Sequence, residues 1–196
     1  MLGNGRPFVI EMFNPRKRFD IGEKQLLDLT DKVNEHDYVN VRGLHFTDKR
    51  CFEQLTHSAD SKVKAYCAVI KASRANKELT ETLNATGDIV IKQMTPLRVL
   101  HRRTLMIREK VIHSAKVHWL NEHYGLCFVL SSAGTYIKEF VHGDLNRTRP
   151  NIGSLLGCEA DIVQLDVLYL YEKYSDETKR HFIEITNEYL LNFNLN

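Results

Sequence analysis

The chain of 196 residues lacks any apolar run near the ~20 residues that cross a bilayer, so the sequence does not predict a membrane protein. Its first residues, Met1 to Arg6, also lack the basic region and apolar stretch of a secretory signal. We found no internal repeat and no low-complexity segment. With 43% apolar and 27% charged residues, the composition predicts a soluble globular protein that lies inside the cell, in the nucleus or the cytoplasm.

The cysteines and histidines lack the short paired spacings of a zinc site. The four cysteines are far apart in the sequence, at Cys51, Cys67, Cys127 and Cys158. The nine histidines are similarly scattered, without a His-x-x-x-His pair beside an acidic ligand. We therefore expect reduced thiols in the core and no metal site.

Positive charge is concentrated in one part of the chain. Residues 92–149 hold ten lysines and arginines against four acidic residues, a net +6, whereas the remainder is net −4. The densest point is 98–103, which contains three arginines and a histidine. Because salt confines each charge to about 8 Å, such a segment attracts phosphate even when the whole chain is nearly neutral. A solvated surface without a ligand is the alternative interpretation.

The first third of the sequence predicts four elements. They are a strand over 6–13, a helix beginning near Asp20, an extended segment over 38–46 and a short helix capped by Thr47. Residues 63–70 then alternate as a strand with two different faces. One face carries Val63, Ala65, Cys67 and Val69, and the other carries Lys64, Tyr66, Ala68 and Ile70.

The rest of the chain is dominated by predicted strands. Residues 73–88 leave a long loop and a helix equally open. The segments that favour strands are 89–91, the hairpin 104–120 with 126–130, and 162–171. The last strand is expected to carry one apolar face, formed by Val163, Leu165, Val167, Tyr169 and Tyr171. A helix follows from Asp176, and the whole pattern predicts the α+β class with an antiparallel or mixed sheet.

Two stretches carry a resemblance to a known family. They are 93–103, QMTPLRVLHRR, and 133–155, which begins AGTYIKEFVHGD and continues through RTRPNIGSL. Together they resemble the tenth family of pseudouridine synthases, the archaeal and eukaryotic enzymes that convert uridines in the TΨC arm of tRNA. The resemblance extends roughly from Met1 to Val167. It implies a catalytic core built on a mixed, mostly antiparallel sheet flanked by helices, with a cleft across the sheet.

The same resemblance implies an isomerisation without a cofactor, in which a uracil leaves its ribose, turns and is rejoined through carbon. Tyr66 matches the family's active-site tyrosine. Its ring would stack on the extruded base, and its phenol is a candidate to accept the proton from the base carbon. Without the family, a sheet tyrosine that packs against Ile70 would be the simpler interpretation.

Tyr136 and Lys138 match the motif that supplies a second tyrosine and a basic group. They lie about 200° apart on a helix, so both can line one cleft only if the helix begins near Lys138, and Gly134 lets the chain turn there. The resemblance implies that Lys138 pairs with the nucleophilic carboxylate and lowers its pKa. The simpler alternatives are a solvent-exposed lysine and a Tyr136 ring that packs on Phe140.

The resemblance also implies a tRNA partner. The side chains expected to contact phosphate are those of Arg98, His101, Arg102, Arg103, Arg147, Arg149 and, less directly, Arg6. The apolar residues expected to line or support the pocket are Ile152, Leu155 and Leu156.

The chain departs from the family in one essential respect. The family's nucleophile is an aspartate just before the stretch that matches Leu2–Phe8, and no equivalent aspartate is present here. We therefore expect residues 1–172 to be an N-terminally truncated catalytic domain that is inactive alone, followed by a helical tail over 173–196. The alternatives are an RNA-binding module without catalysis and a protein partner for the acidic tail. Asn146, where the family usually has glycine, is expected to alter a turn.

Overall fold

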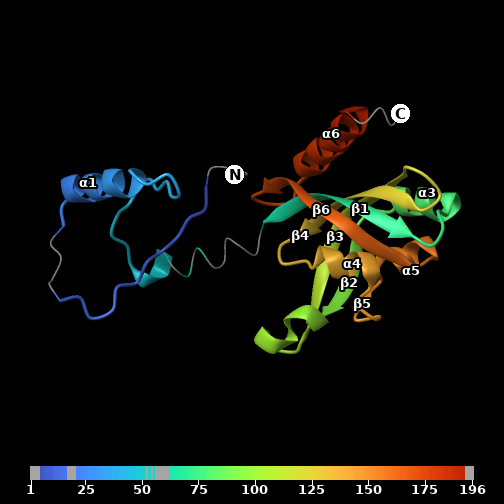
Figure 1. Cartoon of the computed structure of the whole chain (residues 1–196), viewed down its shortest axis with the longest axis horizontal. Helices are drawn as coiled ribbons and strands as arrows, with labels where there is room; N and C mark the ends of the chain where they lie inside the picture. The colour runs from blue at the N-terminus through green and yellow to red at the C-terminus, as the bar shows by residue number, and fades with distance from the viewer. Residues whose placement is uncertain (1–4, 17–20, 52, 54, 56–61, 193–196) are drawn as a thin grey trace. The chain divides into compact units, whose positions relative to one another are not determined.

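The computed structural model describes residues 5–16, 21–51, 53, 55 and 62–192 (Figure 1). By internal contacts the chain forms two units, one over Arg6–His57 and the other over Ser58–Asn196 with Met1–Gly5. No helix in the described part of the chain combines the length and apolarity that a bilayer crossing needs. The expected division at residue 172 stays a prediction.

The smaller unit contains α1 (Glu23–Asn34), which confirms the expected helix, although Asp20 itself lies outside the described residues. Its first turn is closed by a hydrogen bond of 3.0 Å from the Gly22 amide to the Gln25 side chain. Asp48, and not the expected Thr47, caps the next helical turn by accepting from the amides of Arg50 and Cys51.

The expected strand over 6–13 is wrong. In the described residues of the smaller unit, 6–16, 21–51, 53 and 55, no segment pairs as a strand, and this includes the segment 38–46 that is expected to be extended. The apolar side chains of Ile10, Met12 and Phe13 are exposed. Strand formers make a strand only when a partner strand supplies hydrogen bonds and a packing surface.

Residues 62–192 of the larger unit contain a six-stranded sheet in which every pair is antiparallel, in the order β5-β2-β3-β4-β1-β6. The strands are β1 (Val63–Ala72), β2 (Ile89–Met94), β3 (Ile107–Trp119), β4 (Tyr124–Ser132), β5 (Thr148–Arg149) and β6 (Ala160–Tyr171). The α+β class and the expected hairpin are confirmed.

Helices connect and cover these strands. They are α3 (Lys77–Ala85), the 3-10 helix η1 (Leu97–Arg102), α4 (Ile137–His142), α5 (Ile152–Leu156) and α6 (Asp176–Asn192). Thus the segment left open over 73–88 contains a helix. Asn76 caps α3, and the Asn84 side chain exchanges two hydrogen bonds with the Val117 backbone of β3. The contact with β3 is long-range, and no local pattern contains it.

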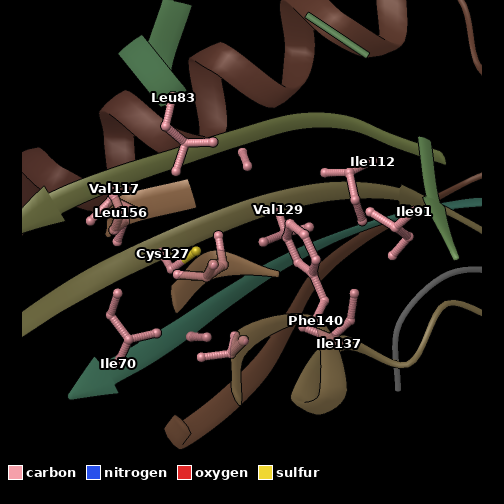
Figure 2. Close-up of a cluster of buried hydrophobic side chains, with 14 residues drawn as sticks. Ile70, Leu83, Ile91, Ile112, Val117, Cys127, Val129, Ile137, Phe140 and Leu156 are labelled. Atoms are coloured by element: carbon pink, nitrogen blue, oxygen red, sulfur yellow. The ribbon is translucent and has the colours of Figure 1, made fainter. Parts of the chain in front are cut away.

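The two faces predicted for β1 are confirmed, because each face belongs to a separate hydrophobic core. Ile70 lies in a core with Phe140 of α4 and Leu156 of α5 (Figure 2). Ala68 belongs to the same core, and Tyr66 packs against it. The opposite face of the sheet forms a second core with α6. Its buried members are Val63, Ala65, Cys67, Leu126, Phe128, Leu130, Tyr171 and Phe182. The apolar side of α6 is therefore occupied by the chain's own sheet.

The single apolar face expected for β6 is wrong. Register shifts opposite Ala65/Tyr66 and Val69/Ile70 leave Leu168 and Val163 without direct partners on β1. Each extra residue turns the following side chains to the other face. Ile162 and Leu165 consequently pack against the first core, Leu168 and Tyr171 join the second, and Val163 is 61% exposed.

Two cysteines lie in the core, as expected, and two do not. Cys67 and Cys127 are buried, and burial raises the pKa of their thiols to about 11 and about 12. Cys51 and Cys158 are only partly buried.

Replacing Phe182 with alanine should detach α6. The Phe182 side chain is 0% exposed between α6 and the sheet, and truncation of a fully buried phenylalanine costs about 3–5 kcal/mol of unfolding free energy. Urea unfolding followed by circular dichroism measures this loss. Leu191→Ala on the same helix is the matched control, since Leu191 is 58% exposed. An equal loss in both variants would contradict the packing described here.

Candidate functional site

The turn before α4 sets the positions of Tyr136 and Lys138. Gly134 adopts φ +70°, which permits a tight reversal after β4, and the Lys110 ammonium donates a hydrogen bond of 2.7 Å to the Ala133 carbonyl. Tyr136 is the extended residue before the helix, and the helix begins at Ile137. The helix thus begins one residue before Lys138, which meets the condition for both side chains to line one cleft; that they do so stays a prediction.

A buried glutamine fixes the backbone of Tyr136. The Gln93 amide nitrogen donates to the Tyr136 carbonyl, and the Gln93 amide oxygen accepts from the Tyr136 amide, both at 2.9 Å. Gln93 is itself buried on β2. This pair of hydrogen bonds ties the start of α4 to the sheet in the way that a neighbouring strand would.

An ion pair joins α4 to η1. The Arg98 guanidinium donates to Glu139 from Nε at 2.7 Å and from Nη2 at 3.4 Å, and the Glu139 side chain is only 2% exposed. The hydrogen bond to Glu139 raises the pKa of Arg98, which keeps its positive charge fixed. The same guanidinium lies 5.8 Å from the centre of the Tyr136 ring, within cation–π range.

Asp144 makes a second connection, directly after α4. Its carboxylate accepts a hydrogen bond of 3.1 Å from the Leu97 amide. It also lies 3.5 Å from the buried Nε atom of Arg147. This second contact is an ion pair that lacks the geometry of a hydrogen bond. Arg147 Nη2 also donates to the Thr95 carbonyl at 2.8 Å. Arg98 and Arg147, both expected to contact phosphate, are thus engaged within the protein.

Tyr66 lies on the sheet face that α4 covers. Its side chain packs against the core that contains Ile137 and Phe140, and it pairs with Val129 of β4 and Val167 of β6. Burial raises the pKa of the Tyr66 phenol, so the group stays protonated at neutral pH in the free protein.

The remaining expected cations are exposed. Lys138 is exposed on α4, and His101, Arg102 and Arg103 are exposed at the end of η1. Within the described residues none of these four forms an ion pair. Arg149 is exposed on β5 and donates from Nε to the Asn146 carbonyl at 3.0 Å. Arg6 is exposed in the smaller unit.

The apolar residues expected at the pocket belong to the first core. Ile152 and Leu156 are completely buried, and Leu155 packs against them at the edge. Within the described residues, no three His, Cys, Asp or Glu side chains gather as a metal site requires. The expected absence of a metal stays a prediction.

Sequence reasoning missed Gln93, Glu139 and Asp144, although all three lie inside or between the recognised stretches. One signal was available for Glu139, because it stands between Ile137 and the apolar pair Phe140–Val141 on a short helix. A charge placed among apolar residues at this spacing is buried and needs a partner. No local signal identifies Arg98, 41 positions away, as that partner.

Replacing Arg98 with alanine should destabilise the larger unit, because the buried Glu139 carboxylate loses its partner. An unsatisfied buried acceptor costs about 1–3 kcal/mol of unfolding free energy. Urea unfolding measures the change. Arg102→Ala, which removes an exposed arginine from the same 3-10 helix, is the control and should shift stability by less than about 0.5 kcal/mol. If the two variants lose the same free energy of unfolding, the Arg98–Glu139 ion pair does not stabilise the larger unit.

The sequence comparisons identify related proteins. The family model described as Pus10, C-terminal matches residues 1–170. The tRNA pseudouridine synthase Pus10 of Mus musculus is 44% identical over 168 residues, covering 85% of this chain and 32% of that protein. That of Thermofilum pendens is 34% identical over 175 residues, covering 87% of this chain and 38% of that protein. The chain therefore spans about a third of the length of these relatives.

Among solved structures, a Cbf5-Nop10-Gar1 complex contains a similar chain. The match has a TM-score of 0.45 and 23% identity, and it covers 64% of this chain and 36% of that one.

Proposed function

The chain belongs to the family described as Pus10, C-terminal, and from that premise we propose that it forms the catalytic region of a tRNA pseudouridine synthase acting on the TΨC arm. One observation carries the proposal: Tyr66 of β1 packs against the same core as α4, the helix that begins between Tyr136 and Lys138. Tyr66 on β1 and Lys138 on α4, both implied to act at the base, thus lie on elements that pack together on one sheet face.

The reaction breaks the bond between ribose C1′ and uracil N1, turns the base and forms a bond from C1′ to C5. The electron pair of the broken bond stays on N1, which takes up a proton, and C5 gives its proton to a base in the site, so the isomerisation balances without an oxidant or a cofactor. We assign stacking on the free uracil to Tyr66, because an aromatic face holds a base without specifying how the base is turned about its own plane.

We assign Lys138 to the electrostatic part of the reaction. Unlike Arg98 and Arg147, Lys138 has no ion-pair partner among the described residues, so its ammonium is available to a carboxylate. An ammonium within a few ångström would stabilise the ionised form of the nucleophile and lower its pKa. No residue of this chain is assigned as that nucleophile.

We assign the exposed cations His101, Arg102, Arg103 and Arg149 to the RNA backbone. Contacts to phosphate position an RNA without reading its sequence. The hydrogen bonds of Arg98 and Asp144 hold η1 in place, so its exposed side chains are attached to a rigid backbone. Less side-chain and backbone freedom is then lost on binding.

Isomerisation tests the proposal directly. The protein translated from the complete gene should release tritium from a tRNA transcript labelled at uracil C5, and Lys138→Met should lower the rate by about 100-fold or more, as expected for an electrostatic contact to the reacting groups. Tyr66→Phe keeps the stacking ring, so it should preserve RNA affinity and lower the rate if the phenol accepts the C5 proton. A wild-type protein that releases no tritium would overturn the proposal.

RNA binding tests the exposed cations on this chain alone. Replacing both Arg102 and Arg103 with alanine should weaken binding to a tRNA transcript and reduce the slope of log affinity against log salt by about 2, one for each lost phosphate contact. Filter binding between low and physiological salt measures both quantities. The matched control is the adjacent exposed pair Lys179 and Arg180 on α6, on the other face of the sheet. Equal effects in the two double variants would contradict a localised RNA surface.

RNA binding without tritium release by the complete protein would indicate the alternative, a module without catalysis.

A further inference from the structure

The segment after α4 has an unusual backbone. Four consecutive residues adopt left-handed φ angles: Gly143 at 76°, Asp144 at 47°, Leu145 at 56° and Asn146 at 66°. Only glycine adopts this region freely, and most other residues are strained there. Asp144 and Asn146 are of the residue types that tolerate the conformation best after glycine. Leu145 is not, so it is held there at a cost.

The surrounding structure fixes this left-handed turn, 143–146. The Gly143 amide donates to the Glu139 carbonyl at 2.8 Å, and the Thr148 amide donates to the Gly143 carbonyl at 3.0 Å. The Asp144 carboxylate ties the turn to Leu97 and Arg147, as described above. Gly143 is also packed so closely on the Asn151 amide that a Cβ would lie 2.6 Å from Asn151 Nδ2. The turn is therefore rigid and connected to η1.

The result of this arrangement is an apolar side chain directed into solvent. Leu145 is 84% exposed, while Gly143 before it is buried and Arg147 after it is mostly buried. Hydrophobic burial does not offset the backbone strain at Leu145, because most of the Leu145 side chain is open to solvent. A strained conformation that contributes nothing to packing is typical of a residue that contacts a ligand.

The charges around the turn indicate the kind of ligand. The exposed side chains that flank it are cations or neutral: Lys138 and His142 on α4, Asn146 in the turn and Arg149 on β5. The acidic residues nearest in sequence, Glu139 and Asp144, are paired internally with Arg98 and Arg147. A phosphate backbone, which carries a regular row of negative charges, matches this single sign of charge.

We propose that Leu145 is an apolar wedge that enters the base stack of a structured RNA and occupies the space left by the extruded nucleotide. The proposal rests on the proposed function and extends it from chemistry at the base to removal of the base from its stack. Apolar side chains inserted between base steps unstack them, and extrusion of a base is unfavourable unless a wedge offsets the lost stacking. Leu145 has no polar group to pair with a base edge, so its insertion is independent of base identity.

The test uses this chain and an RNA hairpin of the TΨC arm that carries 2-aminopurine beside the target uridine. Fluorescence of 2-aminopurine rises when the base loses its stacking neighbours, and anisotropy of an end label reports binding separately. We expect the wild-type chain to bind and to raise the fluorescence. Leu145→Ala should lose most of that rise while its Kd stays close to wild type, and Leu145→Met, which keeps the apolar volume, should retain the rise.

The outcomes separate the two proposals. If the wild-type chain does not bind the hairpin, the wedge fails, whereas the proposed function is still decided by tritium release from the complete protein. If it binds and Leu145→Ala retains the full fluorescence rise, or if the wild-type chain gives no rise, the wedge alone is overturned. A matched melting temperature for the three proteins, expected because Leu145 is exposed, excludes unfolding as the reason for a lost signal.

Discussion

The site depends on one buried charge. Glu139 lies 2% exposed at the centre of α4, and burying a carboxylate is unfavourable unless a cation meets it with good geometry. Arg98 does so with two donors, and this requirement holds η1 against α4. The same guanidinium lies over the Tyr136 ring, so one interaction fixes three parts of the site together. An apolar residue at 139 would pack, yet it would specify no partner on η1.

The cations of residues 92–149 divide into two groups by this logic. Arg98 and Arg147 neutralise Glu139 and Asp144 and serve the fold, whereas Arg102 and Arg103 have no ion-pair partner among the described residues and remain open to solvent. The internally paired arginines hold the backbone that carries the exposed ones, so both groups contribute to one surface.

Local patterns predicted the parts of the fold that depend on neighbours in sequence. The two faces of β1, the turn at Gly134 and the start of α4 at Ile137 all follow from spacing or from glycine's freedom. The predictions that were wrong concern segments whose structure depends on partners far away in the sequence. Residues 6–13 have strand formers without a partner strand, and β6 changes face at bulges set by its pairing with β1. Likewise the recognised motifs contained Glu139, but only the folded chain joins it to Arg98.

The two cores of the larger unit are coupled through β1, and this links α6 to the candidate site. Tyr66 points to one core, while its neighbours Ala65 and Cys67 point to the other. Cys67 forms a side-chain hydrogen bond with Tyr189 of α6, and Phe182 packs in the same core. The helix lies beyond the residues that the family model matches. Protein interiors are close-packed, so α6 and α4 constrain the same strand from its two faces. The C-terminal helix thus packs against the strand that holds Tyr66, on the opposite face of the sheet.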